Sequence, residues 1–298
     1  MKHFLAALFS LTLIACGGGG GSGSDGMGRL VVGLTDAPVD NADAVVVTFD
    51  AISIKPQSGP AVDIELVEAM SIDVLSYQGE DRVLLLDDVA VEPGDYNWMR
   101  LSVIEEDSYI EIDGLQFPLE IPSGAERGLQ LNQGFGVAAG AVTDFTLDFD
   151  LRKSVHQEGT GDYKLRPTIR VINTLEMGSV SGTVAADLIN SELCNNGDNN
   201  DTGNVVYFFN GTDQIPQDEQ GAEGDPALSA SVTYNSESDT YEFLAGFVAV
   251  GNYTAVFTCD ASLDVATENN SDVVLFGDPI NVSVTLGERS TIEFTASL

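Results

Sequence analysis

The sequence predicts an all-β protein of two β-sandwich domains, each with Greek-key or prealbumin-like connections. Short runs rich in Val, Ile, Leu and aromatic residues alternate with Gly, Pro, Asp and Asn, at the spacing typical of sandwiches. No segment has the period of a long amphipathic helix. The run from Phe145 to Leu151 alternates apolar and polar side chains, which predicts odd positions in a core and even positions in solvent.

The N-terminus resembles the signal of a bacterial lipoprotein. Residues 1–15 have a short basic start and an apolar run that closes in Leu13-Ile14-Ala15 directly before Cys16. The run is too short to span a bilayer comfortably, and small residues precede the cysteine, as in a cleaved export signal. The resemblance implies cleavage before Cys16 and its acylation, palmitate included. A plain signal peptide with an incidental cysteine is the alternative.

A Gly- and Ser-rich tether over residues 16–28 follows the anchor and behaves as a flexible coil. Gly17 stands where an aspartate would resemble an inner-membrane retention signal. We therefore expect a chain that is lipid-anchored at the cell outer membrane, facing the periplasm or the cell surface.

Two blocks of predicted strands follow, one domain over residues 29–176 and a second over residues 179–298. The strands expected in the first block are Arg29–Leu34, Ala44–Phe49, Ala61–Val67, Arg82–Leu86, Tyr96–Ile104, Tyr109–Ile112, Phe145–Leu151 and Lys164–Ile172. Residues 70–77 fit either a helical turn or a strand. The strands expected in the second block are Ser179–Ala185, Asn204–Phe209, Ser229–Tyr234, Thr240–Ala245, Asn252–Cys259, Asn281–Leu286 and Thr291–Thr295.

The charge of the chain excludes one class of partner. Its 12 Lys and Arg face 47 Asp and Glu, which gives a formal net charge of −35. Such a field repels phosphate backbones, so nucleic acid is not expected as a partner. The acidity fits a high-salt habitat or a role in binding Ca²⁺, whose ligands are oxygens. Because the acids are spread along the whole chain, we favour the habitat.

Histidine and cysteine are too scarce for the common metal sites and nucleophile pairs. After the signal, the only histidine is His156, so neither a zinc site of ordinary composition nor bis-histidine haem ligation can form. No Gly-x-Ser-x-Gly elbow, Walker loop or Gly-x-Gly-x-x-Gly helix start occurs. A hydrolase that works with two carboxylates stays open as a third hypothesis.

Cys194 and Cys259 remain once Cys16 is assigned to the anchor. A pair of cysteines in an oxidising compartment is most simply a disulfide. A reduced, buried pair is the alternative.

Ordered motifs in the first block resemble the bacterial family known as domain of unknown function 4382. They run over roughly residues 29–175 and comprise Gly33-Leu34-Thr35-Asp36-Ala37-Pro38-Val39, Ala44-Val45-Val46-Val47-Thr48-Phe49, Pro93-Gly94-Asp95-Tyr96, Met99-Arg100-Leu101, Ile121-Pro122-Ser123-Gly124, Leu147-Asp148-Phe149-Asp150-Leu151-Arg152-Lys153-Ser154 and Lys164-Leu165-Arg166-Pro167. The resemblance implies a secreted or lipid-anchored β-rich protein, with no activity attached.

The second block is similar to the carboxypeptidase regulatory-like, prealbumin-type sandwiches. The similarity rests on Ser181-Gly182-Thr183-Val184, Asp239-Thr240-Tyr241-Glu242-Phe243, Val250-Gly251-Asn252-Tyr253-Thr254-Ala255 and Gly287-Glu288. Asp239-Thr240 departs from the usual Asp-Gly, and Ala249-Val250-Gly251 departs from Pro-Ala-Gly. A shared fold of this kind does not by itself imply a function.

One loop has the alternating oxygen ligands of a calcium site. Its candidate ligands are Asn196, Asp198, Asn200, Asp201 and Thr202, ahead of Gly203. The twelfth loop position is Phe209, so the closing glutamate is missing. A solvated acidic loop is the alternative, and Ca²⁺ is the only cofactor considered.

Tyr96 and Trp98 are two residues apart on one expected strand and therefore predicted to share a face. Exposed together they would form a sugar-stacking platform; buried, they are core.

Three aspartates also invite a functional interpretation. Asp36 precedes Ala-Pro, where a side chain more often caps a turn than catalyses. Asp148 and Asp150 are expected on the outer face of one strand, paired with Arg100 or Arg152, or forming a shallow binding face.

These observations favour a lipid-anchored envelope protein that acts as a non-catalytic interaction, adhesion or scaffold module. Its expected partners are the membrane, through the lipid, and envelope proteins or glycans. A carbohydrate- or calcium-binding module is the alternative.

Overall fold

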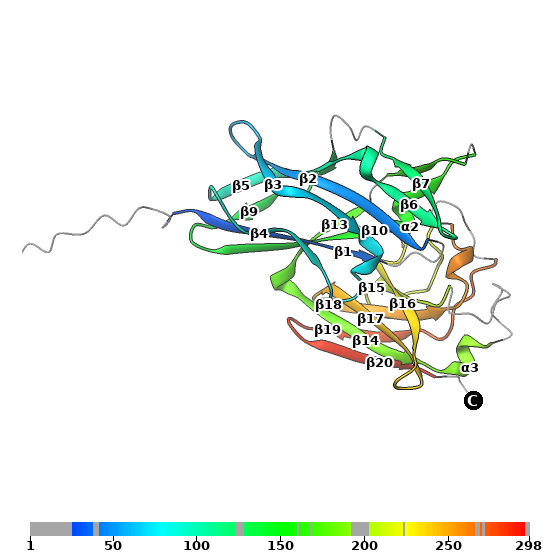
Figure 1. Cartoon of the computed structure of the whole chain (residues 1–298). Helices are drawn as coiled ribbons and strands as arrows, with labels where there is room; N and C mark the ends of the chain where they lie inside the picture. The colour runs from blue at the N-terminus through cyan, green and yellow to red at the C-terminus, as the bar shows by residue number, and fades with distance from the viewer. Residues whose placement is uncertain are drawn as a thin grey trace, which may run out of the picture.

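The computed structural model describes residues 26–37, 42–122, 128–159, 161–166, 168–191, 203–222, 224–265, 269 and 272–295. The strands among these residues form three β-sheets (Figure 1). Two sheets belong to residues 28–173, which we call the N-terminal unit, and the third belongs to residues 177–294, the C-terminal unit. The predicted all-β class is confirmed.

The smaller sheet of the N-terminal unit has four strands, and the first strand of the chain lies inside it. β1 pairs in parallel with β10 and antiparallel with β4, so it is hydrogen-bonded along both edges. In spatial order the strands are β13 (Ile169–Asn173), β10 (Val142–Asp150), β1 (Gly28–Ala37) and β4 (Val83–Val91).

The larger sheet of this unit has nine strands around the long strand β2. The main path is β11 (Val155–Gln157), β12 (Tyr163–Leu165), β7 (Leu115–Glu120), β6 (Tyr109–Ile112), β2 (Ala44–Pro56), β5 (Gly94–Val103) and β8 (Leu129–Leu131). Off this path, β3 (Val62–Asp73) pairs with β2, and β9 (Phe135–Val137) pairs with β5.

A single hydrophobic core lies between these two sheets. Leu34 and Leu147 of the smaller sheet and Ile52 and Leu101 of the larger one are completely buried in it. Alternate residues of each strand supply this core, as expected where two pleated sheets pack face to face.

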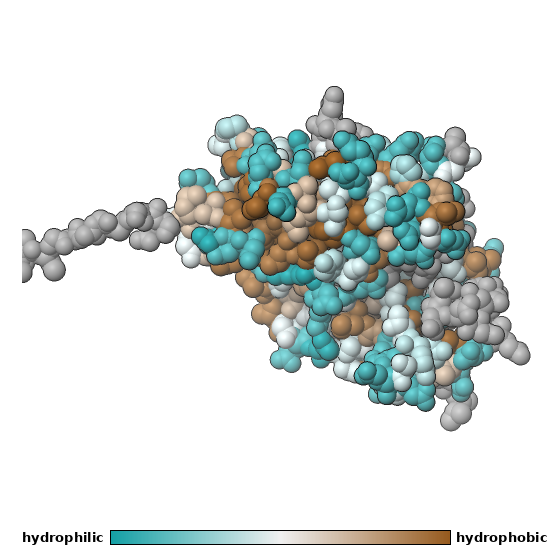
Figure 2. All heavy atoms as spheres, viewed as in Figure 1, coloured by the Kyte–Doolittle hydropathy of each residue, from teal (hydrophilic) through white to brown (hydrophobic). Residues whose placement is uncertain are grey.

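Edge strands β3 and β4 border one side of this core. Partly buried residues of both strands, among them Ile64 and Val83, pack against it, and hydrophobic residues gather along this side in Figure 2. Each edge is irregular. Four residues of β3, from 66 to 69, stand opposite Asp50, and Asp87 and Asp88 interrupt the pairing of β4. Bulges and acidic residues at an edge disfavour pairing with another chain.

The C-terminal unit has one seven-stranded sheet around its own core. Its strands, in spatial order, are β19 (Ile280–Val284), β18 (Gly251–Thr258), β15 (Val205–Asn210), β16 (Leu228–Asn235), β17 (Thr240–Ala249), β14 (Met177–Val184) and β20 (Arg289–Phe294). Phe208 and Phe243 lie in the main core, while Tyr207 and Phe209 are buried on the opposite face of β15. The parallel pairing of β14 with β20 joins the first and last strands of this unit.

Helices are short throughout the described residues. The α-helices α2 (Leu151–Ser154) and α3 (Ala186–Ile189) form one turn each, and the 3-10 turns are η1 (Val74–Ser76), η2 (Glu105–Asp107), η3 (Thr174–Glu176) and η4 (Ala261–Leu263). In the part of the chain described, no helix combines the length and apolarity needed to cross a membrane.

Each strand range expected in the second block overlaps an observed strand, but the first block holds more strands than expected. β7, β8, β9 and β11 were not predicted. β7 contains Pro118, which argues against a strand, and the other three are only three residues long. The expected strand Lys164–Ile172 is two strands, β12 and β13, which lie in different sheets.

Candidate functional site

The segment from Tyr77 to Arg82, between η1 and β4, lies where the two units meet. Thr35 of β1 holds both ends of it: its hydroxyl donates to the carbonyl oxygens of Tyr77 at 3.0 Å and of Asp81 at 2.8 Å. The backbone N–H of Asp36 donates to the same Tyr77 carbonyl at 2.9 Å. The segment is therefore attached to the outer face of the four-stranded sheet, and we call it the junction segment.

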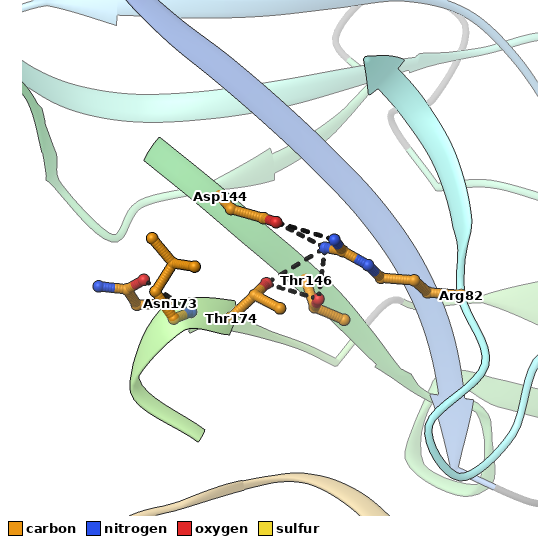
Figure 3. A network of polar contacts seen from close by, with 6 residues as sticks. Arg82, Asp144, Thr146, Asn173 and Thr174 are labelled. Atoms are coloured by element: carbon orange, nitrogen blue, oxygen red, sulfur yellow. Dashed lines mark hydrogen bonds and ion pairs between the residues drawn. The ribbon is translucent and has the colours of Figure 1, made fainter. Parts of the chain in front are cut away.

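Arg82 fastens the end of the junction segment to β10 (Figure 3). Its two terminal nitrogens donate to both carboxylate oxygens of Asp144, at 2.6 and 2.8 Å. Nη1 also donates to the hydroxyls of Thr146 and Thr174, at 3.0 and 3.2 Å, and these hydroxyls lie 2.8 Å apart. Since a guanidinium matches a carboxylate with two parallel hydrogen bonds, this geometry fixes direction as well as charge.

Glu80 connects the junction segment to the C-terminal unit. Its carboxylate forms an ion pair with Arg289 at the start of β20, with a distance of 3.3 Å from Nε to Oε1. The hydrogen bond from Ser179 of β14 holds the pKa of the Glu80 carboxyl below its usual value. Partial burial opposes this shift, and the Arg289 guanidinium adds to it. The pair is about half exposed, so its charge attraction is screened by solvent.

Two glycines let the backbones of the two units touch. Gly79 has φ +66°, and a Cβ on Gly246 of β17 would lie 1.8 Å from the carbonyl oxygen of Gly79. The side chain of Leu244 packs at the same place, 3.0 Å from a Cβ built on Gly79. No side chain larger than hydrogen fits at Gly246 without displacement of the junction segment.

Asp148 lies on the same outer face, under the contact between the units. It pairs with Arg170 of β13, with 2.9 Å between Nε and Oδ2, and is only 6% exposed. Arg170 is also close enough to Tyr253 of β18 to oppose the rise that burial causes in the pKa of that hydroxyl.

The expected solvent-exposed face of β10 is therefore buried. Thr146 and Asp148 occupy the even positions predicted to face solvent, and both are covered. Arg170, the residue that pairs with Asp148, was not among the candidates from the sequence, which were Arg100 and Arg152. Asp150 is only partly exposed, and its backbone N–H donates to the carbonyl of Thr168 at 2.9 Å.

Tyr96 and Trp98 do not share a face of β5. Pro56 pairs with Tyr96 and Lys55 with Trp98, so the extra residue Asn97 forms a bulge that turns Trp98 to the opposite side. Tyr96 is buried, stacks on Phe135 at 5.0 Å and donates to the carbonyl of Glu92 at 2.6 Å. The predicted two-ring sugar platform is therefore not formed.

Trp98 lies partly exposed on the outer side of β5. The guanidinium of Arg100 lies over its ring, 4.5 Å from the centroid. Arg100 also donates to Gln130 of β8 at 2.5 Å. The stacking covers one face of the indole, so that face is not open to a sugar ring.

Several predicted site residues lie outside the described residues. These are the lipidation site Cys16, Cys194, and the calcium candidates Asn196, Asp198, Asn200, Asp201 and Thr202. Cys259 is buried at the end of β18, and its disulfide with Cys194 stays a prediction. Asp36 is buried in β1, while the turn that it is expected to cap falls at residues 38–41, which are not described. Within the described ranges, no three His, Cys, Asp or Glu side chains gather as a metal site requires.

The junction residues were missed in the sequence, although one signal pointed to them. Positive charges are rare here, 12 against 47 acids, so each arginine is surrounded by potential partners. Arg82, Arg170 and Arg289 each hold a carboxylate at the contact between the units. Gly79 and Gly246 gave no such signal, since an isolated glycine in a loop or strand has many explanations.

The N-terminal unit can now be compared with known proteins. Residues 27–167 match the family model described as Domain of unknown function (DUF4382). The match spans β1 to β12 and contains Arg82 and Asp144, so this part of the junction belongs to the DUF4382 region. The resemblance stated from the sequence is supported over these residues. No curated protein matches the chain.

Solved structures similar to the chain are distant from it. One is a Bacteroides ovatus protein described as a candidate adhesin, with 8% identity, a TM-score of 0.22, and coverage of 91% of this chain and 94% of that one. A Bacteroides ovatus fimbrial protein has 10% identity and a TM-score of 0.21, with 91% and 48% covered. The major pilin of Streptococcus pyogenes has 11% identity and a TM-score of 0.18, with 89% and 96% covered.

Proposed function

We propose that the chain is a non-catalytic interaction or scaffold module of the bacterial cell envelope, held to the outer membrane by a lipid on Cys16. The observation that carries the proposal is the junction. The Glu80–Arg289 ion pair and the contact of Gly79 with Gly246 join the two units, and Arg82 with Asp144 attaches the junction segment to the N-terminal sheet; these contacts support one orientation of the units. Domains of one chain move relative to one another unless their contact is extensive, and a scaffold gains from a fixed contact.

The two units correspond in this proposal to a DUF4382 domain over residues 29–176 and a carboxypeptidase regulatory-like, prealbumin-type domain over residues 179–298. The separate cores of the two units support this division. The Gly- and Ser-rich residues 16–28 then connect the anchor directly to β1.

Spin labels test whether the units move as one body. Val67→Cys on β3 and Ile215→Cys in the C-terminal unit offer exposed positions, at 103% and 87% exposure. Pulsed electron resonance on the doubly labelled full chain is expected to give one narrow distance distribution. The same chain with Gly246→Arg is expected to give a broad one. The chain without the two added cysteines is the control, because any spin label on it must have reacted with a native cysteine. A broad distribution in the unaltered junction contradicts the proposal.

The anchor has its own test. In a Gram-negative host, the full chain is expected to incorporate an alkyne-labelled palmitate and to sediment with outer membranes. Cys16→Ala is expected to lose both properties, because it removes the acylated thiol. Unchanged labelling of Cys16→Ala would place the lipid on another residue, and absence of labelling in the unaltered chain would rule it out.

The calcium alternative is tested separately. Millimolar Ca²⁺ is expected to raise the melting temperature if the loop that contains Asp198 and Asp201 binds it, and alanine at both positions is expected to abolish the rise. An unchanged melting temperature removes calcium from the proposal.

A further inference from the structure

A pocket of mixed polar and apolar lining lies beside the junction, on the outer face of the C-terminal sheet. Its volume is about 500 Å³, within the range of small-molecule sites. The floor is formed by strands β14, β16, β17 and β20, and Gln78 and Gly79 of the junction segment form a wall. The pocket therefore takes residues from both units.

Five hydroxyl groups cover the floor of this pocket: Ser181, Thr183, Ser231, Thr233 and Thr291. We call them the hydroxyl floor. All five residues are partly or fully exposed. Unlike Thr35, Thr146 and Ser179, none of the five is hydrogen-bonded through its side chain to another described residue. Their donors and acceptors face solvent and are available to a ligand.

The register of the strands orders these hydroxyls. Glu242 of β17 stands between Thr183 of β14 and Thr233 of β16, each directly opposite it. In the neighbouring row, Ser181 stands between Leu244 of β17 and Thr291 of β20. Adjacent strands are about 4.8 Å apart, and same-face residues of one strand are about 7 Å apart. Hydrogen-bonding groups thus flank the apolar side chain of Leu244, and a sugar ring likewise presents hydroxyl groups around apolar C–H surface.

The charges of the pocket favour a neutral ligand. Hydrogen bonds from Ser238, Asn235 and Thr240 lower the pKa of Glu242 to about 2, so its carboxylate is ionised, and these three bonds leave about one lone-pair position for a ligand. The guanidinium in the lining, that of Arg289, is paired with Glu80. The surrounding net charge of −35 repels anionic ligands.

The geometry points to a binding site for a neutral oligosaccharide at the hydroxyl floor, with Glu242 as the central acceptor and Gln78 as a wall. This inference rests on the proposed interaction role and names the class of its ligand. Because β14, β16 and β17 are each hydrogen-bonded along both edges, recognition over these strands goes through side chains and not through added strand pairing. Hydroxyl, carboxylate and amide groups suit the hydroxyls of a sugar.

Titration of the full chain with neutral hexasaccharides of glucose, mannose, xylose and N-acetylglucosamine tests the site by saturation-transfer NMR and calorimetry. At least one is expected to bind. The double variant Thr183→Val and Thr233→Val is expected to bind it about tenfold more weakly, because two hydrogen-bonding groups are lost. Valine is favourable in strands, so the sheet should be retained. Gln78→Ala is expected to weaken binding without a change of melting temperature.

Thr212→Val is the matched control, because its hydroxyl lies outside the pocket lining. It is expected to bind like the unaltered chain. The inference is overturned if no hexasaccharide binds, if the double variant binds equally well, or if hexagalacturonate or hexalysine binds better than every neutral sugar. The spin-label distance separates this failure from failure of the scaffold proposal. A narrow distribution of spin-label distances together with no sugar binding would rule out the pocket as a sugar site and leave the scaffold proposal standing.

Discussion

The carbonyl oxygen of Gly79 occupies the space that a side chain of Gly246 would need, since a Cβ there would lie 1.8 Å away. These residues belong to different units and meet through main-chain atoms. A contact of this kind has no flexible side chain that could move aside. The first prediction follows from it.

Gly246→Ala is expected to destabilise the chain by about 1–3 kcal/mol, because the added methyl group overpacks a contact between backbones. Urea denaturation measures the loss. Gly159→Ala is the control: nothing lies within 4 Å of a Cβ built there. That substitution should stay within about 0.5 kcal/mol of the unaltered chain. Equal stability of both variants would mean that the two backbones do not touch in solution.

Arg82 and Asp144 are expected to depend on each other. Their side chains are 20% and 15% exposed, so removal of Arg82 leaves a poorly solvated carboxylate. We expect Arg82→Ala to cost about 2 kcal/mol, and Arg82→Lys to recover only part of it, because lysine cannot form the paired hydrogen bonds. A double-mutant cycle with Asp144→Ala measures the coupling. Additive losses would contradict a direct interaction.

Glu242 is expected to make stability fall in acid. Its pKa is about 2 in the folded chain against an ordinary 4.5, so folding favours the ionised form. The contribution is complete above pH 4.5 and is lost as the pH falls towards 2. Urea midpoints at several pH values should therefore drop less steeply for Glu242→Gln than for the unaltered chain.

Glu237→Gln is the matched control for this profile. Glu237 is exposed in the same hairpin, and its carboxylate has no hydrogen bond to the described residues. It should keep the slope of the unaltered chain. If Glu242→Gln has that same slope, the hydrogen bonds from Ser238, Asn235 and Thr240 do not hold the carboxylate in solution.

Tyr96 and Trp98 are expected to respond to substitution in different ways. Tyr96→Phe should cost about 1 kcal/mol, because the buried ring loses its hydrogen bond to Glu92. Arg100→Ala should leave stability nearly unchanged but raise acrylamide quenching of Trp98, because the guanidinium covers the indole. Arg166→Ala serves as the comparison for quenching. No increase with Arg100→Ala would show that the stacking is absent.

The strands were predictable wherever side-chain alternation decides the structure. The C-terminal unit was anticipated strand by strand, because hydrophobic runs and turn residues alternate regularly there. Residues 70–77, which fitted a strand or a turn, form the end of β3 followed by η1. The local sequence is compatible with both a strand and a turn. Packing against the rest of the sheet decides where the strand ends and the turn begins.

Features that depend on two distant segments were not predictable. In the sequence, Asn97 looks like any polar residue of a strand. The bulge that it forms nevertheless turns Tyr96 and Trp98 to opposite faces of β5. The alternation in β10 correctly placed Leu147 and Phe149 in a core. It could not reveal that the C-terminal unit and two arginines cover the even positions of the same strand. Likewise, the five hydroxyls of the pocket come from strands that are brought together only by the register of the sheet.

The parallel pairing of β1 with β10 bears on when the chain can fold during its synthesis. Residue 29 pairs with residue 90 on one edge but finds its second partner only at residue 142, and the second edge of β14 finds residue 289 only at β20. Each unit thus begins with a strand that cannot be completed until most of that unit has been synthesised. Contacts so distant in sequence form slowly. The export proposed from the N-terminal signal would need a chain that is still unfolded when it crosses the membrane, and late completion of both sheets suits that need.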